Sequence, residues 1–482
     1  MNNHLIFNKS REGKVGYSLP ESDVPAVLPA DIFDESELRS KDASLPEVTE
    51  PEVIRHFTNL SVKNHHVDRD LYPLGSCTMK YNPKVNEVTS QLSGFTAVHP
   101  RQPEETIQGA LAIIFGLEEQ LKAITGMDRF TLQPSAGSQG ELTGVLLMRK
   151  YHLLKGNDRR VILIPDTAHG TNPASVMMGG CEVRNVLTNK RGRVDLEDLK
   201  KKLSENVVGM MLTVPNTLGL FESDIEEITR LVHEAGGLMY MDGANLNALL
   251  GIVRPVDMGF DIVHINPHKT FSTPHGGGGP GSGPIGVVEK LVDLLPIPLV
   301  ERQGERYSLN YDLPNSIGRI HSFFGNFGIL VRAYTYIQMV GRERLSTLSR
   351  QAILNANYLK HRVQKAYDLY IGDHCMHEFV LTAKKQKDRG VKALDIGKRL
   401  LDFGFHAPTI YFPMNVPEAL MVEPTESETM ENLDRFAKAL LQIDEESKTD
   451  PEKVQNAPYS TPVRRLDEVS ANRSLNLRWM PE

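Results

Sequence analysis

Short apolar stretches alternate with helical stretches through the middle of this 482-residue chain. The apolar stretches begin near Val161, Val183, Val207 and Leu238, and amphipathic segments separate them. Parallel strands need a long crossover connection, which is usually a helix, so this alternation predicts a mostly parallel sheet with helices on both faces. In such an α/β fold, ligands bind at the loops beyond the carboxyl ends of the strands.

The pattern changes along the chain and predicts three regions. Residues 1–95 are rich in proline and charge and have weak periodicity, which indicates an extended N-terminal arm. Residues 96–330 carry the alternation and form the predicted large domain. Residues 331–482 are richer in helical patterns and include strand-like stretches at 378–382 and 409–412, which predict a smaller α+β C-terminal domain and a tail. A chain of this length is too long for one simple core.

Some helix boundaries can be predicted locally. Apolar residues from Ile107 to Ile124 follow helical spacing, and Gly126 is placed to end that helix. Ser223 and Glu226 have the spacing of a capping box, which predicts where the helix over 224–233 begins.

Composition excludes several classes of function. The net charge is −7 with acids and bases interspersed, so the sequence has no cluster of basic residues of the kind that binds nucleic acid. No apolar run is long enough for a signal peptide or a membrane span, and we expect a cytoplasmic protein without a membrane partner. The three cysteines have neither metal-type nor CxxC spacing, and we interpret them as reduced thiols: Cys77 in an accessible turn, and Cys181 and Cys375 as buried residues.

Lys269 is the first candidate catalytic residue. It follows a predicted strand and precedes a run of glycines at 276–279, which would let the loop move or approach another subunit. A lysine in that position can project its amine into a cleft as a nucleophile, and such an amine forms a Schiff base with pyridoxal phosphate. The alternative is a solvated surface lysine, which is the more common fate of lysines.

Asp242 and His169 are two further candidates at predicted strand ends. The buried stretch 237–242 ends on Asp242, which would pair with the protonated pyridine nitrogen of the cofactor and keep its ring an electron sink. A turn aspartate is the alternative. His169 follows the apolar stretch at 161–164, and its ring would either stack on the pyridine ring or form turn hydrogen bonds.

A phosphate-binding turn is predicted between the strand-like stretch 130–132 and the helix over 141–155. Small residues at a helix start leave backbone N–H groups available to an anion, and the helix dipole adds to the attraction. The alternative is an ordinary strand-to-helix turn. The residues of the predicted turn are Ser135, Ala136, Gly137, Ser138 and Gln139.

The turn, the acid and the lysine follow one another along the chain, and each would serve a different need of one cofactor. Their joint occurrence is more specific than any one of them. We predict no metal site, because His65, His66 and His268 lack a spaced set of acids or thiols. His268 is expected instead near the anionic cofactor. The GxGxxG match at 281–286 contains a proline and precedes a strand, so it is not a dinucleotide-binding turn.

Four segments together resemble one family. They are LYPLGSCTMKYNP at 71–83, AHGTNPAS at 168–175, NPHKTF at 266–271 and VEPTESE at 422–428. They resemble glycine decarboxylase, the P-protein of the glycine cleavage system, and the chain length resembles the second, lysine-bearing subunit of its split form. The resemblance implies a pyridoxal-phosphate-dependent transferase of the aspartate-aminotransferase-like fold, fold type I.

The same resemblance implies a reaction and partners. Glycine would be decarboxylated, its aminomethyl group would pass to the lipoyl group of the H-protein, and CO2 would be released. The implied partners are the lipoylated H-protein and a homologous first subunit, with two copies of each chain. Lys269, Asp242 and His169 would be the catalytic residues, and Tyr72, Ser76 and Cys77 of the arm would line the cleft between chains.

Two alternatives stay open at this point. Another lyase or transferase of fold type I, such as a cysteine desulfurase, would need a reactive cysteine on a late loop, and Cys375 is the one late cysteine. A non-catalytic subunit that keeps the fold is the other alternative, against which Lys269 and Asp242 argue.

Overall fold

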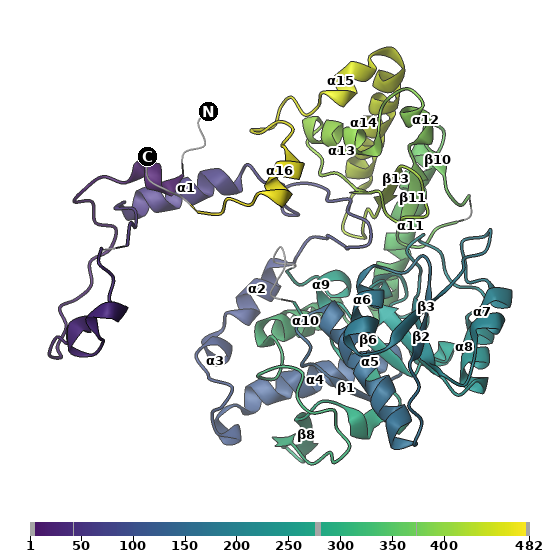
Figure 1. The fold of residues 1–482 in the computed structure, drawn as a ribbon, viewed down its shortest axis with the longest axis horizontal. Coiled ribbons are helices and arrows are strands. Elements are labelled where there is room, and N and C mark those ends of the chain that lie inside the picture. Colours follow the sequence, from purple (N-terminus) through teal and green to yellow (C-terminus); the bar gives the residue numbers. More distant parts are fainter. Residues whose placement is uncertain (1–4, 42, 275–280, 373, 479–482) are drawn as a thin grey trace. The chain divides into compact units, whose positions relative to one another are not determined.

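The computed structural model describes residues 5–41, 43–274, 281–372 and 374–478. The predicted glycine-rich loop at 276–279 lies outside these residues. Contacts within the chain divide it into two units, one of Val67–Ser460 and one of Met1–His66 with Thr461–Glu482 (Figure 1). The predicted arm of residues 1–95 therefore extends over part of both units.

The unit that holds the two ends of the chain has almost no core. Its helices are η1 (Ile6–Lys9), η2 (Pro29–Asp31), η3 (Glu35–Glu37), α1 (Glu50–Ser61) and α16 (Glu468–Arg473). Thr49 and Glu52 form a capping box that begins α1, and the Lys14 ammonium lies 2.5 Å from the Glu52 carboxylate. His56 is the one buried side chain among the described residues of this unit, so its apolar side chains are exposed or only partly buried.

The larger unit is built on a seven-stranded sheet of order β1-β7-β6-β5-β4-β2-β3 (Figure 1). Its strands are β1 (Arg129–Thr131), β2 (Val161–Pro165), β3 (Glu182–Val186), β4 (Val207–Thr213), β5 (Leu238–Gly243), β6 (Ile262–Ile265) and β7 (Ile285–Val287). Strands β2 to β6 pair in parallel, whereas β7 pairs antiparallel with both β6 and β1. The mostly parallel sheet predicted from the alternation is confirmed.

Two hydrophobic cores lie on the two faces of this sheet. Successive strand side chains point to opposite faces, so Met239 and Met241 of β5 enter one core while Leu238 and Tyr240 enter the other. The first core includes α4 (Gln108–Thr125), α7 (Leu196–Lys202), α8 (Ile225–Glu234) and α10 (Phe327–Val340). The second includes α5 (Gly137–Leu154), α6 (Thr171–Met178) and η7 (Glu289–Leu294).

Local signals predicted one helix end correctly and one helix start incorrectly. Gly126 ends α4 with φ +77°, a left-handed conformation that glycine adopts without steric cost. The capping box of Ser223 and Glu226 is absent. The residue that caps α8 is Asp224, which makes no side-chain cap bond, so Glu226 is one position too early in the helix to complete the box.

Shorter elements connect the large sheet to the rest of this unit. They are α2 (Lys84–Ser90), α3 (Ser93–Thr96), η4 (Glu104–Thr106), η5 (Leu246–Ala248), η6 (Pro255–Met258), α9 (Pro267–Thr270), η8 (Arg342–Arg344) and the hairpin of β8 (Leu299–Gln303) and β9 (Arg306–Asn310). Helix α9 follows β6 directly and carries Lys269.

A smaller antiparallel sheet of order β10-β11-β13-β12 forms a second layer in the same unit. Its strands are β10 (Asp368–Leu369), β11 (Phe379–Thr382), β12 (Thr409–Ile410) and β13 (Ala419–Val422). Its helices are α11 (Leu345–Val363), α12 (Lys384–Lys387), α13 (Ala393–Asp402), α14 (Met430–Thr449) and α15 (Pro451–Gln455). Leu359, Leu400 and Leu440 pack with Phe379 and Leu420 of this sheet in a core of their own. Both strand-like stretches predicted at 378–382 and 409–412 hold strands.

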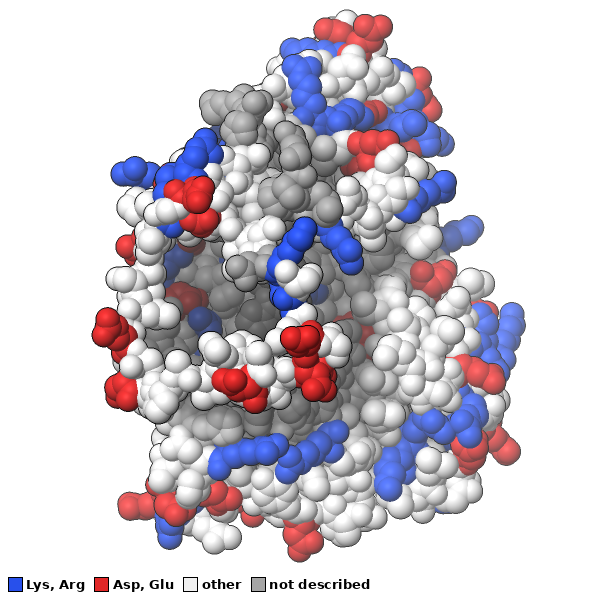
Figure 2. All heavy atoms as spheres, turned by 60° about the vertical axis from the view of Figure 1, so that its left-hand side comes forward, with Lys and Arg blue, Asp and Glu red and all other residues white. Residues whose placement is uncertain are grey.

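None of the helices in the described part of the chain has the length and apolar composition needed to cross a bilayer. On the face drawn in Figure 2, acidic and basic side chains of the described residues lie among one another in small groups.

Candidate active site

The predicted site residues come from loops at one edge of the large sheet. Asp242 lies at the carboxyl end of β5, Lys269 follows β6, and His169 follows β2, and these strands are parallel. The turn at Ser135 follows β1, which runs parallel to β6 because both pair antiparallel with β7. This edge is where parallel sheets bind ligands.

The Lys269 side chain is buried and points at the backbone of a distant segment. Its residue is 7% exposed, and its ammonium Nζ donates a hydrogen bond to the Ser76 carbonyl oxygen at 2.7 Å. Ser76 belongs to the predicted arm, so the structure brings an arm residue to the candidate catalytic lysine. A solvated surface lysine is therefore excluded as the description of Lys269.

Asp242 is buried and held by three neighbours. Its Oδ2 accepts a hydrogen bond from Asn172 Nδ2 at 3.0 Å, its Oδ1 accepts one from the Ala244 N–H at 3.0 Å, and His264 Nε2 lies 3.3 Å from Oδ1. Burial alone would raise the pKa of Asp242, yet His264, the Asn172 amide and Lys269 together hold that pKa below its usual value. Asp242 is thus a buried carboxylate that stays ionised.

Further buried side chains are hydrogen-bonded around Asp242 and its neighbour His264. The Tyr240 hydroxyl and His264 Nδ1 share a hydrogen bond of 2.7 Å. Glu141 of α5 accepts hydrogen bonds from the hydroxyls of Thr171 at 2.8 Å and Ser175 at 2.9 Å. Burial and then the nearby Asp242 raise the pKa of Glu141 to about 8, so a neutral acid stands beside an ionised one.

The predicted phosphate-binding turn leads into α5, and two of its hydrogen-bond donors are bonded to a side chain of the turn itself. Gln139 Oε1 accepts from the Ser135 N–H at 2.6 Å and from the Ser135 hydroxyl at 2.8 Å, so those two donors face Gln139. The first N–H groups of α5, from Gly137 on, have no acceptor within the helix. Ala136 precedes the helix, and Ser138 is exposed.

Close packing behind this turn requires glycine. A Cβ on Gly137 would lie 2.3 Å from Asn266 Oδ1, three residues before Lys269. A Cβ on Gly283 would lie 2.1 Å from the Ala136 carbonyl oxygen. Ser282, the residue before Gly283, has a buried hydroxyl without a hydrogen-bond partner among the described residues.

His169 is partly buried at the mouth of the same region. Its Nδ1 shares a hydrogen bond of 2.8 Å with the Thr171 hydroxyl, and its ring lies edge to face with Phe412, with centroids 5.7 Å apart. Burial and then Lys269 lower the pKa of His169, so its imidazole is neutral at neutral pH. His268 is partly buried on α9, beside Lys269 in the sequence.

The three cysteines are all free thiols. Cys181 and Cys375 are buried and Cys77 is partly exposed, which confirms the sequence prediction. Burial raises the pKa of Cys77, although the ammonium of Lys269 acts against this shift. The third arm residue, Tyr72, stacks its ring on His406 with centroids 4.0 Å apart.

Several residues of the site were not identified as candidates. Glu378 accepts the Ser76 N–H at 2.8 Å, and Glu423 accepts the Thr78 hydroxyl at 2.6 Å. Lys80 is buried, and its ammonium lies 2.6 Å from the Glu426 carboxylate while also donating to the Thr270 carbonyl oxygen at 2.9 Å. Thr78, Lys80, Glu423 and Glu426 all lie within the segments that carry the family resemblance, which was the available signal.

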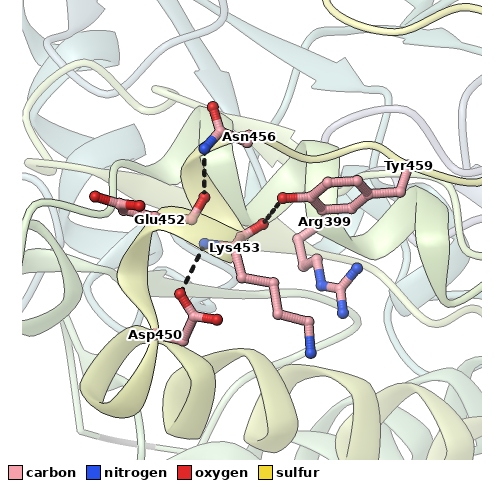
Figure 3. A pocket seen from close by; sticks show the side chains of 6 residues that line it. All are labelled: Arg399, Asp450, Glu452, Lys453, Asn456 and Tyr459. Carbon is pink, nitrogen blue, oxygen red and sulfur yellow. Dashed lines mark hydrogen bonds between the residues drawn. The ribbon is translucent and has the colours of Figure 1, made fainter.

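A separate polar hollow of about 580 Å³ lies in the layer of the small sheet (Figure 3). Its lining residues are Arg399, Asp450, Glu452, Lys453, Asn456 and Tyr459. Two of its polar groups already have partners: the Tyr459 hydroxyl donates to the Lys453 carbonyl oxygen, and the Arg399 guanidinium lies 2.9 Å from the Glu446 carboxylate. These elements carry none of the predicted site residues.

Two family profiles match the sequence. The profile described as glycine cleavage system P-protein matches residues 11–305, and that described as glycine dehydrogenase, C-terminal domain, matches residues 348–462. The probable glycine dehydrogenase (decarboxylating) subunit 2 of Chloroherpeton thalassium is 58% identical, and the match covers 100% of this chain and 99% of that protein. The protein of the same name from Listeria monocytogenes is 53% identical, with 99% and 98% covered.

Solved structures share the fold. A crystal structure of glycine decarboxylase (P-protein) of the glycine cleavage system, in inhibitor-bound form, matches with a TM-score of 0.73 at 20% identity, over 86% of this chain and 95% of that one. A NifS-like protein matches with a TM-score of 0.60 at 16% identity, over 78% and 99%. These matches confirm the predicted fold type I class, and the two sequence profiles with the full-length relatives show that the chain belongs to the P-protein family of the glycine cleavage system.

Proposed function

We propose that this chain is the lysine-bearing subunit of a split glycine decarboxylase that uses pyridoxal phosphate. It decarboxylates glycine, passes the aminomethyl group to the lipoyl group of the H-protein and releases CO2. The observation that carries the proposal is that two buried groups, the carboxylate of Asp242 with its lowered pKa and the amine of Lys269, lie at the same ligand-binding edge of the sheet. The full-length relatives named as subunit 2 support it.

The residues of the site fit this cofactor. Asp242 would face the ring nitrogen, because a buried carboxylate that stays ionised stabilises a protonated pyridine. The first turn of α5 and the unpaired Ser282 hydroxyl would bind the phosphate, since helix starts and hydroxyls bind anions. The amine of Lys269 would bond covalently to the aldehyde carbon of pyridoxal phosphate. His169 and His268 would flank the cofactor, the neutral imidazole of His169 packing on the ring.

The chemistry divides between cofactor and protein. Bound pyridoxal phosphate supplies the electron sink for the electrons that departing CO2 leaves behind. The protein keeps the ring nitrogen charged through Asp242, and Asn172 and His264 keep that carboxylate ionised and oriented. Lys269 moves protons between its amine and the substrate, because its buried amine lies at this edge of the sheet and forms no ion pair with the described residues, whereas the buried Lys80 is paired with Glu426.

The alternative functions fit less well. A cysteine desulfurase needs a reactive thiolate, whereas Cys375 is 4% exposed and burial raises its pKa to about 11. A non-catalytic subunit would not need a buried lysine and a buried aspartate at this edge of the sheet, and both Lys269 and Asp242 are buried there. Free thiols in the described chain also support a cytoplasmic location.

Reduction of the purified protein with borohydride should leave a pyridoxyl adduct on Lys269. The loaded protein should absorb in the visible, because the cofactor is bonded to an amine, and reduction should bleach that band. Mass spectrometry of the digest locates the adduct. Lys80 is the matched control, since it is an equally buried lysine of the same unit that is already paired with Glu426. An adduct on Lys80 or on any lysine other than Lys269 would make the assignment wrong.

Replacing Gly137 with alanine should weaken cofactor binding by roughly tenfold or more. The added Cβ would lie 2.3 Å from Asn266 Oδ1, so both the turn and the residue before α9 must shift. Gly109→Ala is the control, because a Cβ there meets nothing within 4 Å in α4. Titration of each apo-protein with pyridoxal phosphate measures the effect. Equal affinity in the two variants would show that this turn does not bind the phosphate.

The partner assignment rests on the names of the relatives and on the exposed N-terminal unit. Subunit 2 of a split enzyme implies a subunit 1, and we propose a complex with two copies of each chain that receives lipoylated H-protein. We also keep the division into an arm over 1–95, a large domain over 96–330 and a small domain over 331–482 as a proposal for how the enzyme is organised.

A further inference from the structure

Ser76 makes two backbone hydrogen bonds that link a buried acid to the candidate catalytic lysine. Its N–H donates to Glu378 Oε2 at 2.8 Å, and its carbonyl oxygen accepts from Lys269 Nζ at 2.7 Å. Glu378 is 0% exposed and Lys269 is 7% exposed, so both bonds lie away from water. A single residue thus joins the start of β11 to α9.

Ser76 has an unusual backbone conformation. Its φ is +62°, in the left-handed region, which residues other than glycine rarely adopt. Such a conformation persists only where the surroundings hold it, and it occurs most often at functional sites. The Glu378 carboxyl accepts from the Ser76 N–H and so holds the peptide group before Ser76, while the left-handed backbone of Ser76 directs the carbonyl of the next peptide group toward Lys269.

The neighbouring residues anchor the segment on both sides of Ser76. The Thr409 hydroxyl donates to the Gly75 carbonyl oxygen at 2.6 Å, and a Cβ on Gly75 would lie 2.8 Å from the Met421 carbonyl oxygen. On the other side, the Thr78 hydroxyl donates to Glu423 at 2.6 Å. The Gly75 carbonyl and the Ser76 N–H belong to one peptide group, so Thr409 and Glu378 hold that group from its two sides.

We propose that Glu378 is a positioning residue, which fixes the Ser76 carbonyl as a holding site for the Lys269 amine whenever that amine is not bonded to the cofactor. The proposal rests on the proposed function, because each turnover on a lysine-bound cofactor releases this amine and takes it back. A held amine stays close to the reacting atoms and cannot turn away. The amine keeps its proton on the Nζ side of this hydrogen bond, since a carbonyl oxygen only accepts.

Among the described residues, the Ser76 N–H is the one hydrogen-bond donor to the Glu378 carboxyl. His377 Nε2 lies 3.7 Å from Glu378 Oε1, but neither ring nitrogen of His377 has a hydrogen-bond partner among the described residues, nor has Glu378 Oε1. Burial raises the pKa of Glu378 to about 7, and that of Glu423 to about 8 with Glu378 as the second cause. The hydrogen bond from Ser76 is therefore the contact that gives Glu378 a defined role.

The test compares Glu378→Gln with Glu378→Met in the apo-protein. Glutamine keeps an acceptor for the Ser76 N–H but loses the charge, whereas methionine fills the space without an oxygen. Glu423→Gln is the matched control, a second buried acid that holds Thr78 rather than Ser76. Two quantities are measured: hydrogen exchange of the Ser76 amide, by mass spectrometry with residue-level fragmentation, and reductive methylation of Lys269 by formaldehyde relative to the exposed Lys200.

The Met variant should speed exchange of the Ser76 amide by roughly tenfold or more and methylation of Lys269 several-fold, because a lost hydrogen bond frees both groups. The Gln variant and the Glu423→Gln control should stay within about twofold of wild type on the same hydrogen-bond argument. If Gln speeds methylation as much as Met does, charge rather than position is responsible and the proposal is wrong.

Glu378→Asp keeps the proposal testable if the Met variant does not fold, because its shorter side chain draws the acceptor away from the Ser76 N–H while the acid remains. Several-fold faster methylation of Lys269 in Glu378→Asp, with a wild-type rate in Glu378→Gln, supports the holding site, and a wild-type rate in both variants or an equal rise in both overturns it. These measurements need no cofactor, so they separate this proposal from the proposed function. A borohydride adduct on another lysine would remove the function and leave the Ser76 result standing.

Discussion

Asp242→Ala should lower the rate of glycine–bicarbonate exchange by a hundredfold or more while pyridoxal phosphate remains bound. The helix start of α5 and Lys269 would still hold the cofactor, but the ring nitrogen would lose the carboxylate that keeps it protonated. Removal of one such charge-stabilising group commonly costs a factor of about 100 to 1,000 in rate. The exchange rate is measured with lipoylated carrier in excess, at equal cofactor loading checked by absorbance.

Asp261→Ala provides the control for burial and charge. Asp261 is also buried at 4% exposure, and its carboxylate lies 2.8 Å from His233 and 2.5 Å from Lys290. It precedes β6, so it lies at the opposite end of that strand from Lys269. Its loss should lower the unfolding temperature without a comparable loss of rate per loaded cofactor. Near-normal exchange in Asp242→Ala would refute the role of Asp242.

The positions of the main candidate residues at strand ends could be predicted because each has a local signal. Lys269 and Asp242 each follow an apolar stretch directly, and parallel strand order alone then brings their loops to one edge of the sheet. The sign of the Asp242 pKa shift could not be predicted. It depends on Asn172 and His264, whose side chains approach only after α6 and β6 have packed beside β5.

The rest of the site depends on contacts between residues that are far apart in the sequence. Ser76 and Glu378 are 302 residues apart, and Thr78 and Glu423 are 345 apart, so no periodicity relates them. The sequence pattern of the arm was too weak to predict a fold, because the segment takes its shape from the small sheet and from α9. The contact of Gln139 with Ser135 could not be predicted either, since the Gln139 side chain is also held by the Ile320 carbonyl oxygen, far away in the sequence.

The direction of strand β7 could not be predicted from the sequence pattern. Strand and helix alternation predicts parallel neighbours, yet β7 enters between β1 and β6 and runs antiparallel to both. Its apolar residues Ile285 and Val287 predict a strand but contain no information on direction. Direction follows from the connection, which returns from α9 to the same edge of the sheet without a crossover helix among its described residues.

The chain alone should be poorly active, and co-expression with its homologous first subunit should raise CO2 release from glycine by at least tenfold over either chain. The physical reason lies in the unit that holds the two ends of the chain, whose described residues have almost no core. Val27, Leu28, Ile32 and Phe33 are 53–66% exposed, and the unit has one buried side chain among its described residues. Exposed apolar residues that lie this close together in the sequence are typical of an interface, and a unit without a core needs a partner to order it. Gel filtration and a CO2-release assay with excess lipoylated carrier measure the effect.

Interface variants give this prediction a specific control. A Leu28→Asp, Phe33→Asp double variant should lower the affinity for the first subunit by tenfold or more, because two carboxylates would be buried in an apolar contact. Leu154→Asp is the matched control. Leu154 is 52% exposed at the end of α5 that lies away from the phosphate-binding turn, so a charge there should leave assembly unchanged. Full activity of the isolated chain would show instead that the active site is complete within one polypeptide, with Ser76 and Cys77 of its own arm segment serving its own Lys269.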